Sequence, residues 1–248
     1  MGKEQIMKNQ YLTVENIYNM KNDIYCMELS GDCSEISAPG QFINIKIEGF
    51  YLRRPISIFD YDKEHISIAF KAVGPGTQKL AKTKPGETLD VLMPLGNGFD
   101  ISNCGHEPLL VSGGIGFPPI YSLAKVMTEK GISLKVICGF NTAGDIPSMT
   151  MFSEMDIKPV ITTVDGTAGI KGMVTDAMTS EKFDYVYACG PEPMLKAVYE
   201  NAPDGQFSFE ARMACGFGAC MGCSCKTKYG FKRICKDGPV LYKEEIIW

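Results

Sequence analysis

The chain has 248 residues, a formal net charge of −4 and 45% hydrophobic residues. That length allows one large domain or two to three small ones with real cores. The acidic balance and the lack of a concentrated basic face argue against a nucleic-acid partner. No apolar run reaches the roughly 18 residues that a membrane span needs. Residues 1–16 lack the hydrophobic segment of a secretory signal, so we expect a cytoplasmic protein whose thiols stay reduced.

Residues 1–102 are predicted to form a β-domain. Many short strands separated by regular Gly and Pro turn signals are typical of a sandwich or a barrel. One helix is expected at Thr77–Lys84, with Thr77 as its N-cap. The expected strands are Tyr11–Ile17, Ile24–Leu29, Gln41–Ile47, Arg54–Phe59 and His65–Val73.

Residues 103–208 change to alternating strands and helices, which predicts an α/β domain with a parallel sheet covered on both faces. Pro at the start of one predicted helix and Gly131 just past its end have the expected helix polarity. The expected strands are Pro108–Ser112, Ser133–Gly139, Pro159–Val164, Tyr185–Cys189 and Gln206–Phe209, and the expected helices are Pro118–Lys130, Ser148–Met155, Val174–Met178 and Met194–Asn201.

Residues 209–248 hold five of the ten cysteines within 21 residues. The spacing is Cys215-x4-Cys220-x2-Cys223, followed by Cys235 after eleven residues. Three closely spaced cysteines and a later fourth are the plant-type [2Fe–2S] pattern. The glycines and alanines between them permit the sharp turns that bring thiolates and backbone N–H groups to one small cluster.

A structural zinc site and disulfides are the alternatives for these cysteines. Zinc usually shows two CxxC pairs, or Cys with His at helix spacing, and this segment has one CxxC and no His. A fifth cysteine, Cys225, leaves the ligand set open, since it could replace Cys223 or Cys235. The spacing favours Cys225 as a bystander.

Two glycine motifs predict a nucleotide site in the α/β domain. Gly113, Gly114 and Gly116 lie between a strand and a helix, where backbone N–H groups and the helix N-terminus can hold a pyrophosphate. The same Gly-Gly-x-Gly pattern also occurs in simple tight turns. Cys189, Gly190 and Pro191 follow another strand, and ligands of doubly wound sheets bind beyond the carboxyl ends of strands. By residue type alone, a buried strand-end thiol is the more common explanation of Cys189.

Two motifs of the β-domain suit a phosphate. Arg53 and Arg54 precede Pro55, Ile56 and Ser57 on one predicted strand, and arginine donates hydrogen bonds in pairs. A solvated arginine pair is the alternative. The segment 74–77 leads into the predicted helix and gives a second possible anion site, although a turn with an N-cap explains it as well.

The order of these modules resembles the ferredoxin-NADP reductase superfamily. The segments Phe209–Gly216, Ile234–Val240 and Gly113–Pro119 are more specific, and they resemble the electron-transfer subunits of dihydroorotate dehydrogenase B. The resemblance runs from about residue 10 to residue 242. It implies a FAD-binding antiparallel β-barrel, a NAD-binding α/β domain and a small ferredoxin-like [2Fe–2S] domain at the C-terminus.

The resemblance also implies site residues. Ser57 would lie near the flavin N5 and Cys189 near the nicotinamide, neither acting as acid or base. FAD, one per chain, would be bound by Arg54, Pro55, Ile56, Ser57, Lys71, Ala72, Val73, Gly76 and Thr77. NAD would be bound by Gly113, Gly114, Gly116, Cys189, Gly190 and Pro191, and one [2Fe–2S] cluster by Cys215, Cys220, Cys223 and Cys235.

The function that the resemblance implies is an electron relay in pyrimidine (UMP) biosynthesis. Electrons would pass from the FMN of a dihydroorotate-oxidising catalytic subunit through [2Fe–2S] and FAD to NAD. The two subunits would form a heterotetramer of two plus two. One alternative is an NADH-dependent iron–sulfur flavoprotein reductase that serves another partner such as ferredoxin. Another is a redox sensor, which would have no need of a second nucleotide site.

Overall fold

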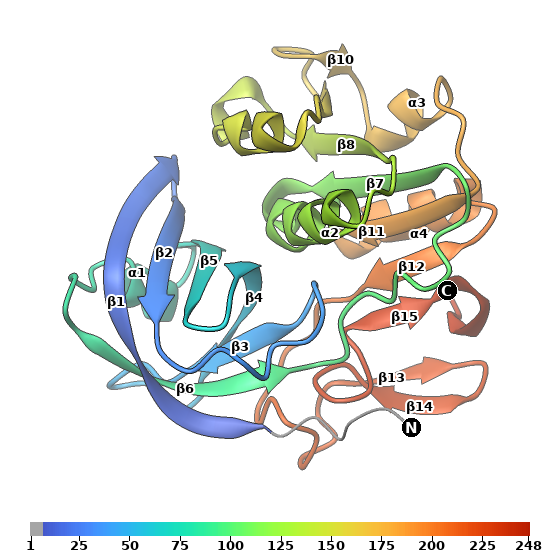
Figure 1. The fold of residues 1–248 in the computed structure, drawn as a ribbon. Coiled ribbons are helices and arrows are strands. Elements are labelled where there is room, and N and C mark those ends of the chain that lie inside the picture. Colours follow the sequence, from blue (N-terminus) through green and yellow to red (C-terminus); the bar gives the residue numbers. More distant parts are fainter. Residues whose placement is uncertain (1–6) are drawn as a thin grey trace.

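The computed structural model describes residues 7–248, which form three parts in chain order (Figure 1). A curved barrel, blue to green in the figure, stands beside a twisted sheet with helices on both faces. A small red hairpin lies below the sheet and next to the barrel. Residues 1–6, on which the expected lack of a secretory signal partly rests, lie outside the described residues.

Six strands close the barrel, and every neighbouring pair is antiparallel, which confirms the predicted antiparallel β-barrel. Its interior is filled by aliphatic side chains that alternate with exposed residues along the strands. The strands lie in the order β1 (Lys8–Lys21), β2 (Ile24–Ser30), β5 (His65–Lys71), β4 (Arg54–Tyr61), β3 (Phe42–Ile45) and β6 (Thr88–Leu95).

Two elements of the barrel domain differ from expectation. Strand β6 has no counterpart among the predicted strands, because Pro94 within its apolar run argues against a strand. It forms because β1 and β3 pair with it on either side and close the barrel. Helix α1 spans Pro75–Leu80 rather than Thr77–Lys84, with Gly74 as its N-cap. Pro75 pre-sets the helical φ and begins the helix earlier, so Thr77 lies inside it.

Seven strands form the second sheet, and all neighbours are parallel except the last pair, β12 and β15. The chain leaves β7 toward one edge and later returns to its other side at β11. The boundary between β7 and β11 is therefore the topological switch point, where ligands bind in such sheets. The order is β10 (Ile170–Lys171), β9 (Val160–Thr163), β8 (Lys135–Phe140), β7 (Pro108–Gly113), β11 (Tyr185–Cys189), β12 (Gly205–Ser208) and β15 (Val240–Tyr242).

Helices cover both faces of this sheet, as expected. Leu110 on β7 faces a core with α2 (Phe117–Glu129), whereas its neighbours Leu109 and Val111 face a second core with α3 (Val174–Met178) and α4 (Glu192–Asn201). The predicted helix at Ser148–Met155 is a short 3₁₀ segment, Thr150–Met155. Among residues 7–248, no helix combines the length and apolar character needed to cross a membrane.

The barrel and the sheet pack through α2 and β4. The ring of Phe59 lies 4.8 Å from that of Tyr121 and 5.7 Å from that of Phe117, measured between centroids. At the rim of this contact, Lys125 Nζ pairs with the carboxylate of Asp60 at 2.7 Å. This interface fixes the carboxyl end of the sheet against the barrel strands β4 and β5.

The C-terminal segment joins both other parts. Strand β15 pairs with β12 and extends the large sheet, and the hairpin β13 (Ser224–Thr227) and β14 (Gly230–Arg233) stands apart from it. Beyond the barrel strand β6, Asn97 holds the backbone of Val240 at both polar groups: its Nδ2 donates to the carbonyl at 2.8 Å, and its Oδ1 accepts from the N–H at 3.1 Å. The cysteine segment is thus anchored to the barrel and to the sheet.

Replacing Asn97 by alanine tests this anchor. Asn97→Ala leaves two backbone groups of Val240 unpaired, so we expect the free energy of unfolding to fall by about 1–3 kcal/mol. Urea unfolding followed by circular dichroism measures this change. The exposed Asn103→Ala is the matched control, with an expected change within about 0.5 kcal/mol. Equal losses in the two variants would contradict the anchoring role.

Candidate functional site

The four predicted cluster cysteines lie together as two pairs. The Cys215 and Cys220 side chains are in hydrogen-bond contact, and so are those of Cys223 and Cys235. The charge of Cys215 also raises the pKa of Cys235. One pair comes from the loop and the other flanks the hairpin; Cys223 and Cys235 are buried, and Cys220 is exposed.

Backbone N–H groups turn toward these sulfurs. The Sγ atoms of Cys215, Cys220 and Cys223 each accept a backbone hydrogen bond at 3.4 Å, from the N–H groups of Cys220, Gly222 and Cys235. Burial opposes ionisation of Cys215, but N–H donors of the loop overcome it and lower the pKa of this thiol to about 6. Burial raises the pKa of Cys235 to about 12. The loop therefore favours a thiolate at its first cysteine.

Side chains outside the loop hold it in this shape. Arg233 donates from Nε to Asp237 at 2.9 Å and from Nη1 to the carbonyl of Gly218 at 2.8 Å. This arginine also holds the pKa of the Asp237 carboxyl below its usual range. Gly216 and Gly218 have φ values of +77° and +92°, which L side chains rarely adopt. The glycines predicted to permit sharp turns are needed at these positions.

The two pairs of thiols suit a [2Fe–2S] cluster. Each iron of such a cluster takes two protein ligands, so two pairs of thiols are the required donor set. Within residues 7–248, no three His, Cys, Asp or Glu side chains are grouped as a single metal ion would need. Cys225 lies on β13 opposite Lys232, and its half-buried side chain packs against the core beneath the sheet. It stays the expected bystander.

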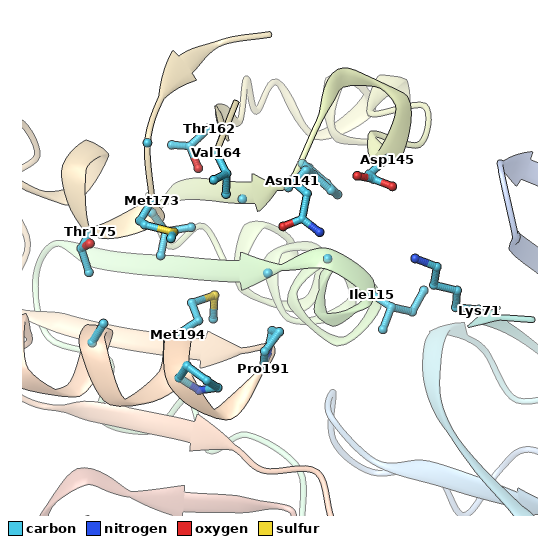
Figure 2. Close-up of a pocket in the computed structure, with 18 of the residues that line it drawn as sticks. Lys71, Ile115, Asn141, Asp145, Thr162, Val164, Met173, Thr175, Pro191 and Met194 are labelled. Atoms are coloured by element: carbon cyan, nitrogen blue, oxygen red, sulfur yellow. The ribbon is translucent and has the colours of Figure 1, made fainter. Parts of the chain in front are cut away.

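A cavity of about 450 Å³ opens at the switch point of the sheet (Figure 2). Such a volume is typical of small-molecule and cofactor sites. Its walls come from the carboxyl ends of β7, β8 and β9, from Pro191 beyond β11, from α3 and α4, and from the barrel residues Asn22, Ile24 and Lys71. The cavity therefore runs from the barrel across the strand ends toward α3.

The two predicted glycine motifs meet in this wall. A Cβ atom on Gly116 would lie 2.2 Å from the carbonyl oxygen of Cys189, and one on Gly113 would lie 2.5 Å from Sδ of Met194. No side chain fits at Gly116, so the backbone just before α2 packs directly on the end of β11, whereas Gly113 lies against the flexible Met194 side chain. Gly113, Gly114 and Pro191 line the cavity, whereas the cavity lining does not include Gly116, Cys189 or Gly190.

Cys189 is buried, and this burial raises its pKa to about 12. A thiol that stays protonated at neutral pH agrees with a role in packing rather than in acid–base chemistry. Lys71, predicted to contact FAD, extends from the barrel into the wall of the cavity near Ile115 (Figure 2). Lys71 and Asp145 are the charged side chains of this lining.

Several lining residues were not predicted from the sequence. They are Asn22, Asn141, Asp145, Thr162, Val164, Met173 and Met194. The rule that selected the ends of β7 and β11 applies equally to β8 and β9, and would have found Asn141 and Val164. Asn22 and Met173 do not follow a parallel strand, so this rule would not have found them. Asn22 lies on a barrel turn, and Met173 lies at the start of α3.

The two anion motifs of the barrel also come together. The guanidinium of Arg54 lies over the ring of Phe50, 5.1 Å from its centroid, and packs on Gly76, where a Cβ atom would lie 2.7 Å from Nε. Thr77 uses its hydroxyl to cap Gly74 at both the N–H and the carbonyl group. The arginine of β4 and the glycine turn of α1 thus form one cradle that suits a pyrophosphate.

The remaining flavin candidates surround this cradle. Pro55, Ile56 and Ser57 pair with β3, with Ser57 opposite Phe42. Ala72 and Val73 follow β5, and the Val73 side chain is 72% exposed. An exposed apolar side chain beside a cationic cradle fits a ring system that lies across the strand ends. Together, barrel, cavity and thiol loop define a pyridine-nucleotide-linked flavin and iron–sulfur oxidoreductase.

Comparison with known proteins specifies the family. The family model for the iron–sulfur cluster binding domain of dihydroorotate dehydrogenase B matches residues 210–247. The chain is 40% identical to the dihydroorotate dehydrogenase B (NAD(+)) electron transfer subunit of Geobacillus sp., covering 98% of this chain and 100% of that protein. The chain is 42% identical to the Bacillus pumilus subunit, covering 97% of this chain and 98% of that protein. The chain belongs to the family of dihydroorotate dehydrogenase B electron transfer subunits.

Solved structures agree with the fold. A chain from the NADH-dependent reduced ferredoxin-NADP oxidoreductase superposes with a TM-score of 0.87 at 30% identity, covering 96% of this chain and 90% of that one. Phthalate dioxygenase reductase superposes with a TM-score of 0.62 at 20% identity, covering 77% of this chain and 63% of that one. The predicted fold class is therefore confirmed, whereas the domain boundaries at residues 102 and 208 stay predictions.

Serine variants test the ligand set. We expect Cys215→Ser to lose the visible absorbance of the cluster, because Cys215 is the thiolate that the loop favours. Cys225→Ser should retain this absorbance, since the cysteine spacing places Cys225 outside the ligand set. Absorbance spectra and iron content of the two purified variants measure the difference. The reverse pattern would show that Cys225 is a ligand.

Proposed function

We propose that this chain carries electrons from the FMN of a dihydroorotate-oxidising catalytic subunit, through a [2Fe–2S] cluster and FAD, to NAD, in pyrimidine (UMP) biosynthesis. One observation carries the proposal: a thiol loop, a pyrophosphate cradle and a dinucleotide cavity are packed together in one chain whose full-length relatives bear that name. The FMN of the partner and a heterotetramer of two plus two are the finer parts of the proposal.

The nucleotide residues have separate tasks. Gly113 and Gly114 leave backbone open to a pyrophosphate in front of the N-terminus of α2. Lys71 supplies a positive charge from the barrel side, where the nicotinamide end must reach the flavin. Asn141, Val164 and Met173 then surround the adenosine end on the far side of the cavity.

The residues predicted to bind FAD orient the cofactor and neutralise the charge of its pyrophosphate. Arg54 and Gly76 hold the pyrophosphate of FAD, and Ser57 presents a hydroxyl near the flavin N5. Pro55, Ile56, Ala72, Val73 and Thr77 shape the surrounding groove. When bound, FAD exchanges two electrons with nicotinamide and single electrons with an iron–sulfur cluster, which is chemistry that side chains do not supply.

A docking surface for the catalytic subunit lies on the cysteine segment. Two aromatic side chains of the β13–β14 hairpin, Tyr229 and Phe231, are both 71% exposed, and Phe217 and Met221 are exposed on the cysteine loop. Exposed aromatic and Met side chains with lysines beside them, here Lys226 opposite Phe231, are characteristic of protein interfaces. A partner on this face would meet the thiol loop directly, as short-range electron transfer requires.

The alternative as a reductase for ferredoxin has one supporting observation. The chain is 30% identical to a protein described as an NADH-dependent reduced ferredoxin-NADP oxidoreductase. The subunit family is matched at 40% identity over the full length, and the model of its cluster domain covers residues 210–247. These matches favour the dihydroorotate role.

A reconstitution assay tests the function. The isolated chain, loaded with FAD and cluster, should oxidise NADH with an artificial dye and should not oxidise dihydroorotate, because that oxidation is assigned to the FMN of the catalytic subunit. Adding the catalytic subunit from the same genome should yield dihydroorotate-dependent reduction of NAD, measured at 340 nm. Dye reduction without any dihydroorotate activity in the complex would favour the ferredoxin alternative.

Variants of the hairpin test the docking surface. Tyr229→Ser with Phe231→Ser should weaken binding of the catalytic subunit by about tenfold or more, because exposed aromatic anchors dominate such interfaces. Binding is measured by calorimetry with both purified subunits. The NADH–dye rate of the isolated variant should stay unchanged. The control is Tyr11→Ser on β1, which is 69% exposed and should bind normally.

A further inference from the structure

One polar side chain, Asn44, is buried on the outer face of the barrel strand β3, where it touches the cysteine loop. It lies on β3 between Ile43 and Ile45, and only 1% of its surface is exposed. A buried amide in an otherwise apolar strand is unfavourable unless it makes hydrogen bonds. Its position therefore calls for an explanation that barrel packing does not give.

The amide bonds to the backbone of the first cluster cysteine. Nδ2 of Asn44 donates to the carbonyl oxygen of Cys215 at 3.4 Å, across 171 residues of sequence. The next residue, Gly216, packs so closely that a Cβ atom would lie 2.2 Å from the same Nδ2. The loop thus rests directly on the Asn44 side chain, with no room for a larger residue.

The backbone of Asn44 belongs to the flavin strand pair. It pairs with Pro55 of β4, between the flavin candidates Arg54 and Ile56. Its carbonyl accepts a hydrogen bond from Arg53 Nη1 at 3.3 Å, and Arg53 is itself fixed by Asp90 at 2.7 Å. One rigidly held residue therefore joins the flavin strand to the cluster loop.

The other end of the amide retains bonding capacity. Oδ1 of Asn44 is buried and makes no hydrogen bond with any group among residues 7–248. Buried amide oxygens in folded proteins are nearly always paired. The amide can thus accept one more hydrogen bond at the boundary between the flavin strand and the cluster loop.

We propose that Asn44 is a positioning residue for electron transfer, which holds the Cys215 end of the cluster loop at a set place on the flavin-binding strand. This inference rests on the proposed function, because it assumes FAD on β4 and a cluster on the loop. Electron transfer depends steeply on separation, so loss of the hydrogen bond matters more for rate than for folding.

Asn44→Leu is the main test, because leucine keeps the volume and removes the amide. The loaded chain is mixed with NADH without oxygen, and flavin bleaching and cluster bleaching are followed separately. We expect flavin reduction at the wild-type rate and cluster reduction slowed by about tenfold or more, as a displacement near 1 Å produces in reaction rates. The electron paramagnetic resonance spectrum of the reduced cluster should also change.

Two further variants keep the test decisive. Gly216→Ala disturbs the same contact from the loop side and should give the same separation of rates. Asn9→Ala is the control, because Asn9 accepts a hydrogen bond from the same Arg53 at 3.1 Å but is exposed on the barrel; it should behave as wild type. In the cluster-free protein, Asn44→Leu should speed hydrogen exchange at Cys215 and Gly216.

The outcomes are distinguishable. Wild-type cluster reduction, spectrum and exchange in Asn44→Leu would show that Asn44 only fills space. Loss of bound flavin or a general loss of fold in both Asn44→Leu and Gly216→Ala would also overturn the proposal in favour of a structural role. Failure of the wild-type chain to reduce its flavin with NADH would instead refute the proposed function.

Discussion

The pairing of β15 with β12 is the constraint on which the arrangement of the three parts depends. It places the end of the cysteine segment in the nucleotide-binding sheet, while Asn97 ties the same strand to the barrel. A loop rich in glycine and cysteine has too little apolar surface to fold alone. Its position is therefore set by hydrogen bonds to two larger bodies, and this keeps the cysteine segment next to both the barrel and the sheet.

The glycines of the site act mainly through close approach. At Gly113, Gly116 and Gly76, a Cβ atom would strike Met194, the backbone of Cys189 or the guanidinium of Arg54. In each case the chain brings backbone from one element against another, which shapes a cradle or a cavity wall. The predicted motifs thus work by packing two segments together as much as by exposing N–H groups to a phosphate.

Positive charge and backbone N–H groups are also concentrated at the expected cofactor sites. Arg54 stands where the pyrophosphate of FAD is expected, Lys71 lies in the wall of the nucleotide cavity, and backbone N–H groups surround the sulfurs of the thiol loop. Cys189, by contrast, is buried at the end of β11 outside the cavity lining, and this burial raises the pKa of its thiol. Charge is thus supplied where anionic groups would bind, whereas the buried thiol serves packing.

The sequence by itself determined the features that local pattern encodes: alternating strands, the glycine turns, and a cysteine spacing dictated by ligand geometry. Tertiary structure alone decided the rest. Strand β6 forms despite Pro94 because two neighbours pair with it, Lys71 turns into the nucleotide cavity, and Asn44 meets Cys215. These contacts join residues far apart in the chain, and no local periodicity records which distant backbone a side chain will reach.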